Sequence, residues 1–196
     1  MIKVGITGGI GTGKTVVCKV FESLGIKSYN ADIRAKQLVL DHPQLKQAII
    51  DHFGSEAYLA NGQYNRSYIA LIVFNDSQKL AQLNELIHPV VFQDFEDWCK
   101  TNQDEPYVIK EAALMIESGS HLKNDFNILV TAPHALRLAR VAARDGLSTL
   151  QIEKIIANQL PESEKLVFAN FIIHNDGAQS LIEQVYKIHH QLIAKQ

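Results

Sequence analysis

The chain has 196 residues, of which 46% are hydrophobic, and its 19 basic and 21 acidic side chains give a net charge of −2. This length suits one compact α/β unit with an insertion, and the hydrophobic fraction is sufficient for a core. The near-neutral balance argues against a nucleic-acid-binding stripe or a polybasic membrane face, and no apolar run is long enough to cross a bilayer.

The first predicted element is a short buried strand at residues 2–7, followed at once by a glycine-rich segment. Residues 8–15, GGIGTGKT, fit G-x-x-x-x-G-K-[ST], the phosphate-binding P-loop. Residues 16–24 are predicted to form the next helix, which Gly25 ends. A strand, a glycine loop and a helix in succession are the context that this motif requires. Because the first residues already belong to a strand, we expect no secretory signal.

The P-loop predicts particular phosphate contacts. Its glycines allow backbone N–H groups to turn inward around phosphate oxygens, and the following helix directs its positive end at the same anion. The lysine is expected to reach the β- and γ-phosphates of ATP, and the threonine hydroxyl to bind Mg²⁺. The expected ATP-binding residues of the loop are Gly9, Ile10, Gly11, Thr12, Gly13, Lys14 and Thr15.

Four further strands are predicted along the chain. Each is short and apolar without clean alternation, as expected of parallel strands that helices cover on both faces. They are residues 26–29, 107–110, 126–131 and 171–174. The intervening residues 33–104 have apolar side chains at helical spacing, with a turn at Asn61-Gly62. The fold class is therefore α/β, with a parallel sheet and a helical insertion where a small-molecule kinase would hold its acceptor.

Three acidic residues, Asp32, Glu111 and Glu117, lie at or shortly after predicted strand ends, where ligands of parallel sheets collect. Asp32 is expected beside the P-loop as the general base for an acceptor hydroxyl, and N-capping of the next helix is an equal alternative. Glu111 resembles the acid of a Walker-B strand and is expected to hold Mg²⁺ through water. A solvated strand-end carboxylate explains Glu111 equally well.

Arg137, Arg140 and Arg144 have the spacing i, i+3 and i+7, which places them on one face of a helix. No acid stands at an i+4 pairing position. Without a P-loop, a solvated basic face would be the better explanation. With one, we expect a lid that clamps the triphosphate during transfer. Asp145-Gly146 is expected to end this helix.

In this order and spacing, the motifs resemble the dephospho-coenzyme A kinase family over nearly the whole chain. The matching segments are residues 5–15, Asn30-Ala31-Asp32, Arg66 with Phe74, residues 86–89 (LIHP), residues 110–119, Arg140 with residues 144–148, Asn158-Gln159 and residues 173–177. Asn30 stands where the family has Asp. It keeps the hydrogen-bonding shape without the charge, so we expect it to support the site rather than act in it.

The resemblance implies transfer of the γ-phosphoryl group of ATP to the 3′-hydroxyl of dephospho-CoA, the last step of CoA biosynthesis, with Mg²⁺. It also implies a P-loop NTPase three-layer fold. The nucleotide-binding core would comprise residues 1–32, 106–136 and 151–196, the helical CoA-binding domain residues 33–105, and the lid residues 137–150.

The resemblance also assigns roles to single residues. Catalysis is assigned to Asp32, Lys14 and Arg140. Further ATP contacts are assigned to Arg144, Asn175 and Gly177, with the last two near adenine. Acceptor contacts are assigned to Asp32, Arg66, His88, Glu111 and Glu117, and the metal to Thr15 and Glu111.

Two of these assignments have structural alternatives. His88 precedes Pro89, and the residue before a proline avoids the α region, so we predict a helix break there, with Pro89 starting the next helix. An acceptor-pocket role for His88 is equally consistent. Arg66 either binds an acceptor phosphate or only caps and pairs locally.

Other functions remain alternatives. A nucleoside monophosphate kinase shares the P-loop, the insertion and the arginine lid, but residues 88–89 and 175–177 argue against it. A GTP-dependent switch needs an N-K-x-D motif, which the sequence lacks. The expected partners are ATP and dephospho-CoA, without nucleic acid or membrane. Cys18 and Cys99 lack metal-site spacing, and we expect a cytoplasmic monomer or weak homo-oligomer.

Overall fold

The computed structural model describes residues 1–74 and 76–195, so Asn75, inside the expected helical insertion, and Gln196 lie outside the described residues. The chain divides into two compact units, which are Met1–Asn30 with Asn102–Gln196, and Ala31–Thr101. The first unit contains the sheet, and the second is helical.

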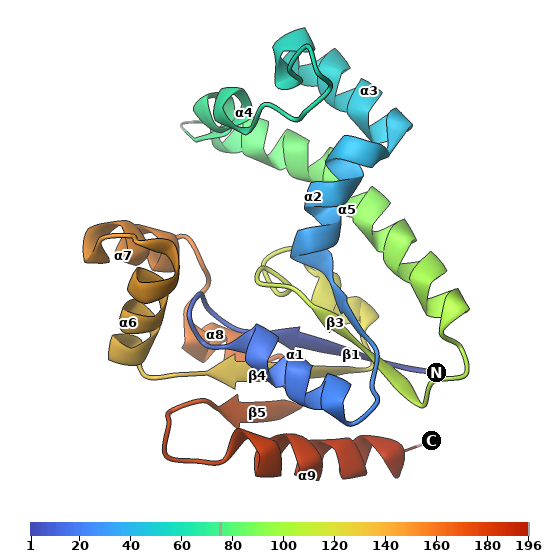
Figure 1. Cartoon of the computed structure of the whole chain (residues 1–196), viewed down its shortest axis with the longest axis vertical. Helices are drawn as coiled ribbons and strands as arrows, with labels where there is room; N and C mark the ends of the chain where they lie inside the picture. Colours follow the sequence, from blue (N-terminus) through green and yellow to red (C-terminus); the bar gives the residue numbers. More distant parts are fainter. Residues whose placement is uncertain (75, 196) are drawn as a thin grey trace. The chain divides into compact units, whose positions relative to one another are not determined.

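Five parallel strands form the sheet of the first unit (Figure 1). They are β1 (Ile2–Thr7), β2 (Ser28–Asn30), β3 (Tyr107–Glu111), β4 (Phe126–Thr131) and β5 (Phe171–His174). The order across the sheet is β2-β3-β1-β4-β5. The predicted parallel α/β sheet is confirmed, although the second strand starts two residues later than expected. Because β1 lies between β3 and β4, its carboxyl end is at the point where the strand order reverses, the usual ligand position in such sheets.

Two helices pack against this sheet and against each other. These are α1 (Lys14–Ser23), which follows the P-loop, and α9 (Leu181–Ile193) at the end of the chain (Figure 1). Phe21 of α1 and Leu192 of α9 are completely buried in the same apolar core as the strand residues. Burial of such a side chain contributes about 1.5–3 kcal/mol, which fixes α1, and with it the P-loop, against the sheet.

Three further helices follow β4: α6 (His134–Asp145), α7 (Thr149–Ala157) and α8 (Glu162–Leu166). The expected end of the arginine helix at Asp145-Gly146 is confirmed, because Gly146 adopts the left-handed conformation with φ 67°. Ser148 then starts α7 through a capping box with Gln151. A short 3₁₀ turn, Ser120–Lys123, precedes β4.

The second unit is helical, as predicted for the insertion. Its helices are α2 (Ala31–Asp41), α3 (Pro43–Phe53), α4 (Arg66–Val73) and α5 (Ser77–Thr101), with a 3₁₀ turn at Ser55–Ala57. The side chains of His42 and Asn65 cap α3 and α4. The predicted turn at Asn61-Gly62 is confirmed, since it joins the paired residues Tyr58 and Tyr64. Arg34 of α2 binds the Asp94 carboxylate of α5 through two nitrogens and fastens these helices together.

The predicted helix break at His88-Pro89 is wrong, because α5 runs without interruption through Pro89. A proline inside a helix removes one backbone hydrogen bond and is normally costly. Here the helix extends for three turns on either side of the proline, and its buried residues Leu83, Val91 and Phe95 lie on both sides of it. Tertiary packing therefore outweighs the local preference that the prediction used.

Candidate active site

The P-loop lies between β1 and α1, and Gly8 and Gly13 are among its glycines that have no room for a side chain. A Cβ at Gly13, where φ is 92°, would lie 2.2 Å from Nδ2 of Asn175. A Cβ at Gly8 would lie 2.3 Å from the carbonyl oxygen of Val130. The loop therefore depends on glycine for its close approach to β4 and to the end of β5. Since α1 begins at Lys14, its positive N-terminal end faces the loop.

The Lys14 side chain folds back onto the loop. Its Nζ donates to the carbonyl oxygens of Gly8 and Gly9, at 2.9 and 3.2 Å. The ammonium group is thereby held beside the backbone amides that are expected to bind phosphate. A phosphate bound there would find the lysine already in place.

Thr15 and Glu111, the two predicted metal ligands, are in direct contact. Thr15 Oγ1 donates to Glu111 Oε1 at 2.7 Å, and Asn30 Nδ2 donates to Glu111 Oε2 at 2.7 Å. Glu111 is only 5% exposed, so the alternative of a solvated strand-end carboxylate is wrong. A carboxylate beside a hydroxyl provides the oxygen ligands that Mg²⁺ prefers, and Mg²⁺ usually takes its remaining ligands from water and substrate phosphates. In the described part of the chain, no cluster of three His, Cys, Asp or Glu residues is placed to hold a metal.

Cys18, one turn after Thr15 on α1, is buried. Burial raises the pKa of its thiol, and the negative charges of Glu111 and Glu22 raise it further. The thiol therefore stays protonated at neutral pH and is a poor nucleophile.

The three arginines of α6 have different partners. Arg137 Nε donates to the carbonyl oxygen of Ile10 in the P-loop at 2.9 Å. Arg140 Nη2 donates to the backbone and side-chain oxygens of Asn175, at 3.1 and 3.2 Å. Arg144 pairs with its neighbour Asp145 at 2.7 Å, a contact that a search for i+4 partners could not find. The three guanidinium groups therefore have separate partners in this structure, and their clamping of a triphosphate stays a prediction.

Arg140 has an unused donor. Its Nη1 is buried and has no hydrogen-bond partner among the residues that the structure describes. Its partner Asn175 in turn donates through Nδ2 to the carbonyl oxygen of Thr12 at 2.8 Å, so Arg140, Asn175 and the P-loop are connected. A buried guanidinium donor with no acceptor is costly, and an anion bound beside it would remove that cost.

Gln159 holds the outer turn of the P-loop, a contact that no pattern in the sequence predicted. The backbone N–H of Ile10 donates to Gln159 Oε1 at 2.9 Å, while Arg137 binds the carbonyl oxygen of the same residue. Both backbone polar groups of Ile10 are thus held by side chains from α6 and from the segment after α7.

Glu117 has partners that the sequence did not indicate. Its Oε1 accepts from the backbone N–H of Leu160 at 3.0 Å and lies 2.7 Å from Nζ of Lys165. Burial alone would raise the pKa of the Glu117 carboxyl, but the hydrogen bonds from Lys165 and the backbone, with the lysine charge, lower it overall. These contacts fasten the segment after β3 to the linker between α7 and α8.

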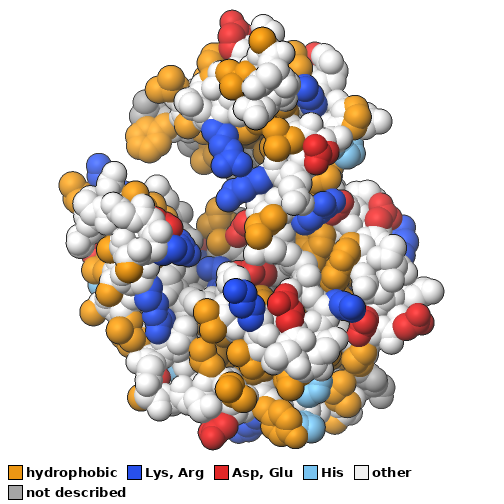
Figure 2. Space-filling model, in the orientation of Figure 1, with side chains coloured by type: hydrophobic (Ala, Val, Ile, Leu, Met, Phe, Trp, Pro, Cys, Tyr) orange, Lys and Arg blue, Asp and Glu red, His pale blue; other side chains and the backbone are white. Residues whose placement is uncertain are grey.

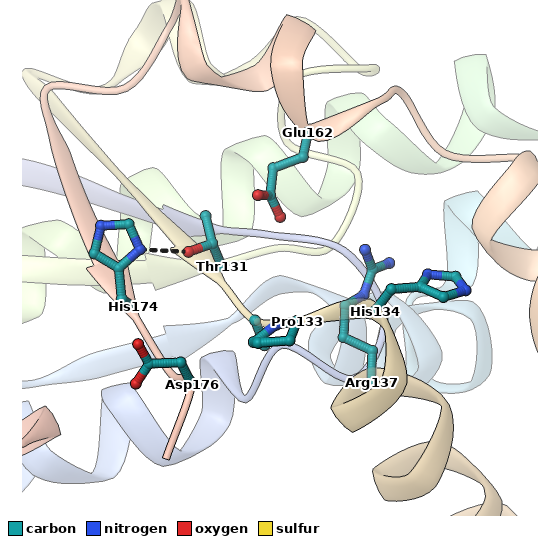
Figure 3. Close-up of a pocket in the computed structure, with 8 residues that line it drawn as sticks. Thr131, Pro133, His134, Arg137, Glu162, His174 and Asp176 are labelled. Atoms are coloured by element: carbon teal, nitrogen blue, oxygen red, sulfur yellow. Dashed lines mark hydrogen bonds between the residues drawn. The ribbon is translucent and has the colours of Figure 1, made fainter. Parts of the chain in front are cut away.

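A cavity of about 450 Å³ opens at the carboxyl ends of β4 and β5 (Figure 3). His174 Nδ1 and Thr131 Oγ1 lie 3.0 Å apart on its wall. The cavity is lined by Thr131, Ala132, Pro133, His134, Arg137, Glu162, His174 and Asp176. Next to it, Gly177 takes the left-handed conformation with φ 83° and turns the chain after β5.

Asp32, Arg66 and His88 belong to the second unit. Helix α2 begins at Ala31, so Asp32 lies inside its first turn rather than at the N-cap, and it is exposed. Arg66 is the first residue of α4, directly after the cap Asn65. His88 lies within the continuous helix α5. Their roles toward the acceptor stay predictions.

The surface agrees with the balanced composition. Figure 2 shows acidic, basic and apolar side chains together on the face that it views. In the described part of the chain, no helix is both long and apolar enough to cross a membrane.

Comparison with known proteins identifies one family. The family model for dephospho-CoA kinase matches residues 2–180. A dephospho-CoA kinase from Salinibacter ruber is 37% identical over 179 residues, which cover 90% of this chain and 90% of the relative. The crystal structure of TT1252 from Thermus thermophilus superposes with a TM-score of 0.84 at 29% identity, covering 97% of this chain and 96% of that one. A dephospho-CoA kinase from Campylobacter jejuni shares the fold, with a TM-score of 0.71 at 24% identity and 98% of both chains covered.

Proposed function

The chain belongs to the dephospho-CoA kinase family, the phosphotransferases of the last step of CoA biosynthesis, and we propose that its first unit binds ATP while its helical second unit binds dephospho-CoA. The observation that carries this proposal is the match of the family model from residue 2 to residue 180, because it spans both units. The P-loop between β1 and α1 supplies the nucleotide site that such a reaction needs.

In this proposal the P-loop amides and Lys14 bind the β- and γ-phosphates of ATP. The loop is supported for that task by the contacts of Ile10 with Arg137 and Gln159. Asn175 and Gly177 lie near the adenine, on the turn after β5. A loop whose shape is fixed before binding loses little entropy when the triphosphate enters.

Thr15 and Glu111 would hold Mg²⁺, which would neutralise negative charge that develops on the phosphates during transfer. The 2.7 Å contact between their side chains supports this assignment. Arg140 would stabilise the transferring phosphoryl group with its buried, unused Nη1 donor, and Arg144 would assist from the exposed end of α6.

Asp32 would accept the proton of the ribose 3′-hydroxyl, or orient that hydroxyl for in-line attack on the γ-phosphorus. Its position two residues after Asn30, the last residue of β2, supports this role. Arg66 and His88 would contact the acceptor from α4 and α5. We further propose a cytoplasmic enzyme, in keeping with the buried free thiols of Cys18 and Cys99.

Product analysis tests this proposal. The purified protein is incubated with Mg-ATP and dephospho-CoA, and the product is compared with authentic CoA and its 2′-phosphate isomer by chromatography and phosphorus NMR. The proposal predicts a single product that matches CoA. Phosphate on the 2′-hydroxyl or on another part of dephospho-CoA would refute the assigned acceptor atom.

A further inference from the structure

The buried carboxylate of Glu111 is held from two sides. Thr15 Oγ1 donates to Oε1 and Asn30 Nδ2 donates to Oε2, each at 2.7 Å. We propose that Asn30 is a positioning residue, whose amide fixes the rotation of the Glu111 carboxylate so that Oε1 stays directed at Thr15, with which it would hold the metal. This inference rests on the proposed metal-binding role of Thr15 and Glu111.

The sheet itself places Asn30 for this task. In the parallel pairing of β2 and β3, Asn30 stands opposite Glu111, and each is the last residue of its strand. Directly opposed side chains project to the same face of a sheet and lie close enough to interact. The amide is therefore positioned by two hydrogen-bonded strands rather than by a mobile loop, which is the condition for holding a ligand in one orientation.

An asparagine at position 30 also orients the Glu111 carboxylate better than an apolar residue, a lysine or an aspartate would. A carboxylate that is 5% exposed needs donors for its oxygens, and an apolar residue at position 30 would withdraw one of them. A lysine would donate, but its charge would neutralise Glu111 and repel a cation. Aspartate would set a second negative charge against Glu111 at hydrogen-bonding distance. Asparagine is a neutral donor, so it orients the carboxylate and leaves one full negative charge for the cation.

Two substitutions at this position then have opposite effects on metal binding. In Asn30→Ala, the Glu111 carboxylate loses the donor to Oε2, and metal affinity should fall about 10- to 100-fold, as is typical when a partner of a metal ligand is removed. In Asn30→Asp, the side chain keeps its size, but the added negative charge should strengthen cation binding. Without metal, the two adjacent carboxylates repel, so this variant should unfold at a lower temperature in chelator.

The experiment measures Mn²⁺ binding directly, by the electron paramagnetic resonance signal of free Mn²⁺ in solutions of protein and ADP. Thermal unfolding with chelator and with Mg²⁺ is followed in parallel. Asn127→Ala is the matched control, because Asn127 is also a buried strand asparagine whose side chain makes two hydrogen bonds, to Asn124 and His121. The control should lose stability without a change in Mn²⁺ affinity.

We expect weaker Mn²⁺ binding in Asn30→Ala and tighter binding in Asn30→Asp, with the larger rise in unfolding temperature on adding Mg²⁺ in Asn30→Asp. Mn²⁺ affinities equal to that of the unmodified protein in both variants would overturn the positioning role. If Asn30→Ala does not fold, Asn30→Ser, which also removes the amide donor, takes its place, and Mn²⁺ binding no weaker than in the unmodified protein contradicts the proposal. Failure of the proposed function would appear separately, as absence of CoA formation by the unmodified protein.

Discussion

The ammonium group of Lys165 lies 2.7 Å from the Glu117 carboxylate, and the lysine side chain is only 1% exposed. Glu117 follows β3 in the chain and Lys165 belongs to α8, so this ion pair joins two distant segments of the first unit. The backbone N–H of Leu160 donates to the same carboxylate oxygen. The pair therefore fastens the segment that ends in Gln159, which in turn holds Ile10 of the P-loop.

Breaking this pair from one side should destabilise the protein strongly. In Lys165→Met the carboxylate of Glu117 loses its counter-charge, and we expect a loss of about 3 kcal/mol in the free energy of unfolding. Urea denaturation measures this loss. The double variant Lys165→Met with Glu117→Gln should lose less free energy of unfolding than the two single variants lose together, because no uncompensated charge remains. Strictly additive effects would show that the two groups do not act as a pair.

The same pair predicts a pH dependence of stability. The pKa of Glu117 is lowered in the folded protein below its ordinary value of 4.5. The unfolded chain therefore binds a proton first as the pH falls, so the stabilisation is complete above that value and is lost as the pH drops through the folded-state pKa. We expect the unfolding temperature of the unmodified protein to fall more steeply below about pH 5 than that of Glu117→Gln. Parallel curves for the two proteins would contradict this.

Arg140 and Arg144 should differ in importance for transfer. Arg140 has a buried donor without a partner among the described residues, whereas Arg144 is an exposed side chain paired with Asp145. We expect Arg140→Ala to lower kcat about 10²- to 10³-fold, the usual effect of losing a donor to developing charge. Arg144→Ala is the matched control on the same helix and should lower kcat much less. Equal losses would remove the distinction between the two arginines.

Asp32→Asn should keep ATP binding and lose most phosphoryl transfer. The substitution preserves size and removes only the charge that accepts a proton or orients the hydroxyl, so kcat should fall about 10²- to 10⁴-fold. Calorimetric titration with a non-hydrolysable ATP analogue serves as the control, because its affinity should not change. A turnover near that of the unmodified protein would end the role assigned to Asp32.

Local patterns in the sequence were sufficient to predict the strands of the sheet and the P-loop. The strands are continuous apolar runs, and the loop is a motif in which the glycines, lysine and threonine each have a fixed geometric task. The predicted stop at Pro89 failed because packing along α5 outweighs the local cost of one missing hydrogen bond. The predicted helix end at Asp145-Gly146 was confirmed, because a C-terminal glycine cap depends only on residues that are neighbours in the chain.

Partners that are distant in sequence could not be predicted in this way. The contact of Gln159 with Ile10 spans 149 positions, and that of Arg137 with Ile10 spans 127. Neither leaves a periodic or motif signal. The contact of Asn30 with Glu111 depends on the register of β2 against β3, which spacing along a single chain does not specify.

Phosphorylation of dephospho-CoA is tested most directly by the release of ADP from Mg-ATP in parallel reactions with dephospho-CoA, with AMP and with no acceptor. We expect rapid release only with dephospho-CoA, accompanied by an equal amount of CoA. Rapid release with AMP, or release that needs no acceptor, would contradict the claim that this chain phosphorylates dephospho-CoA.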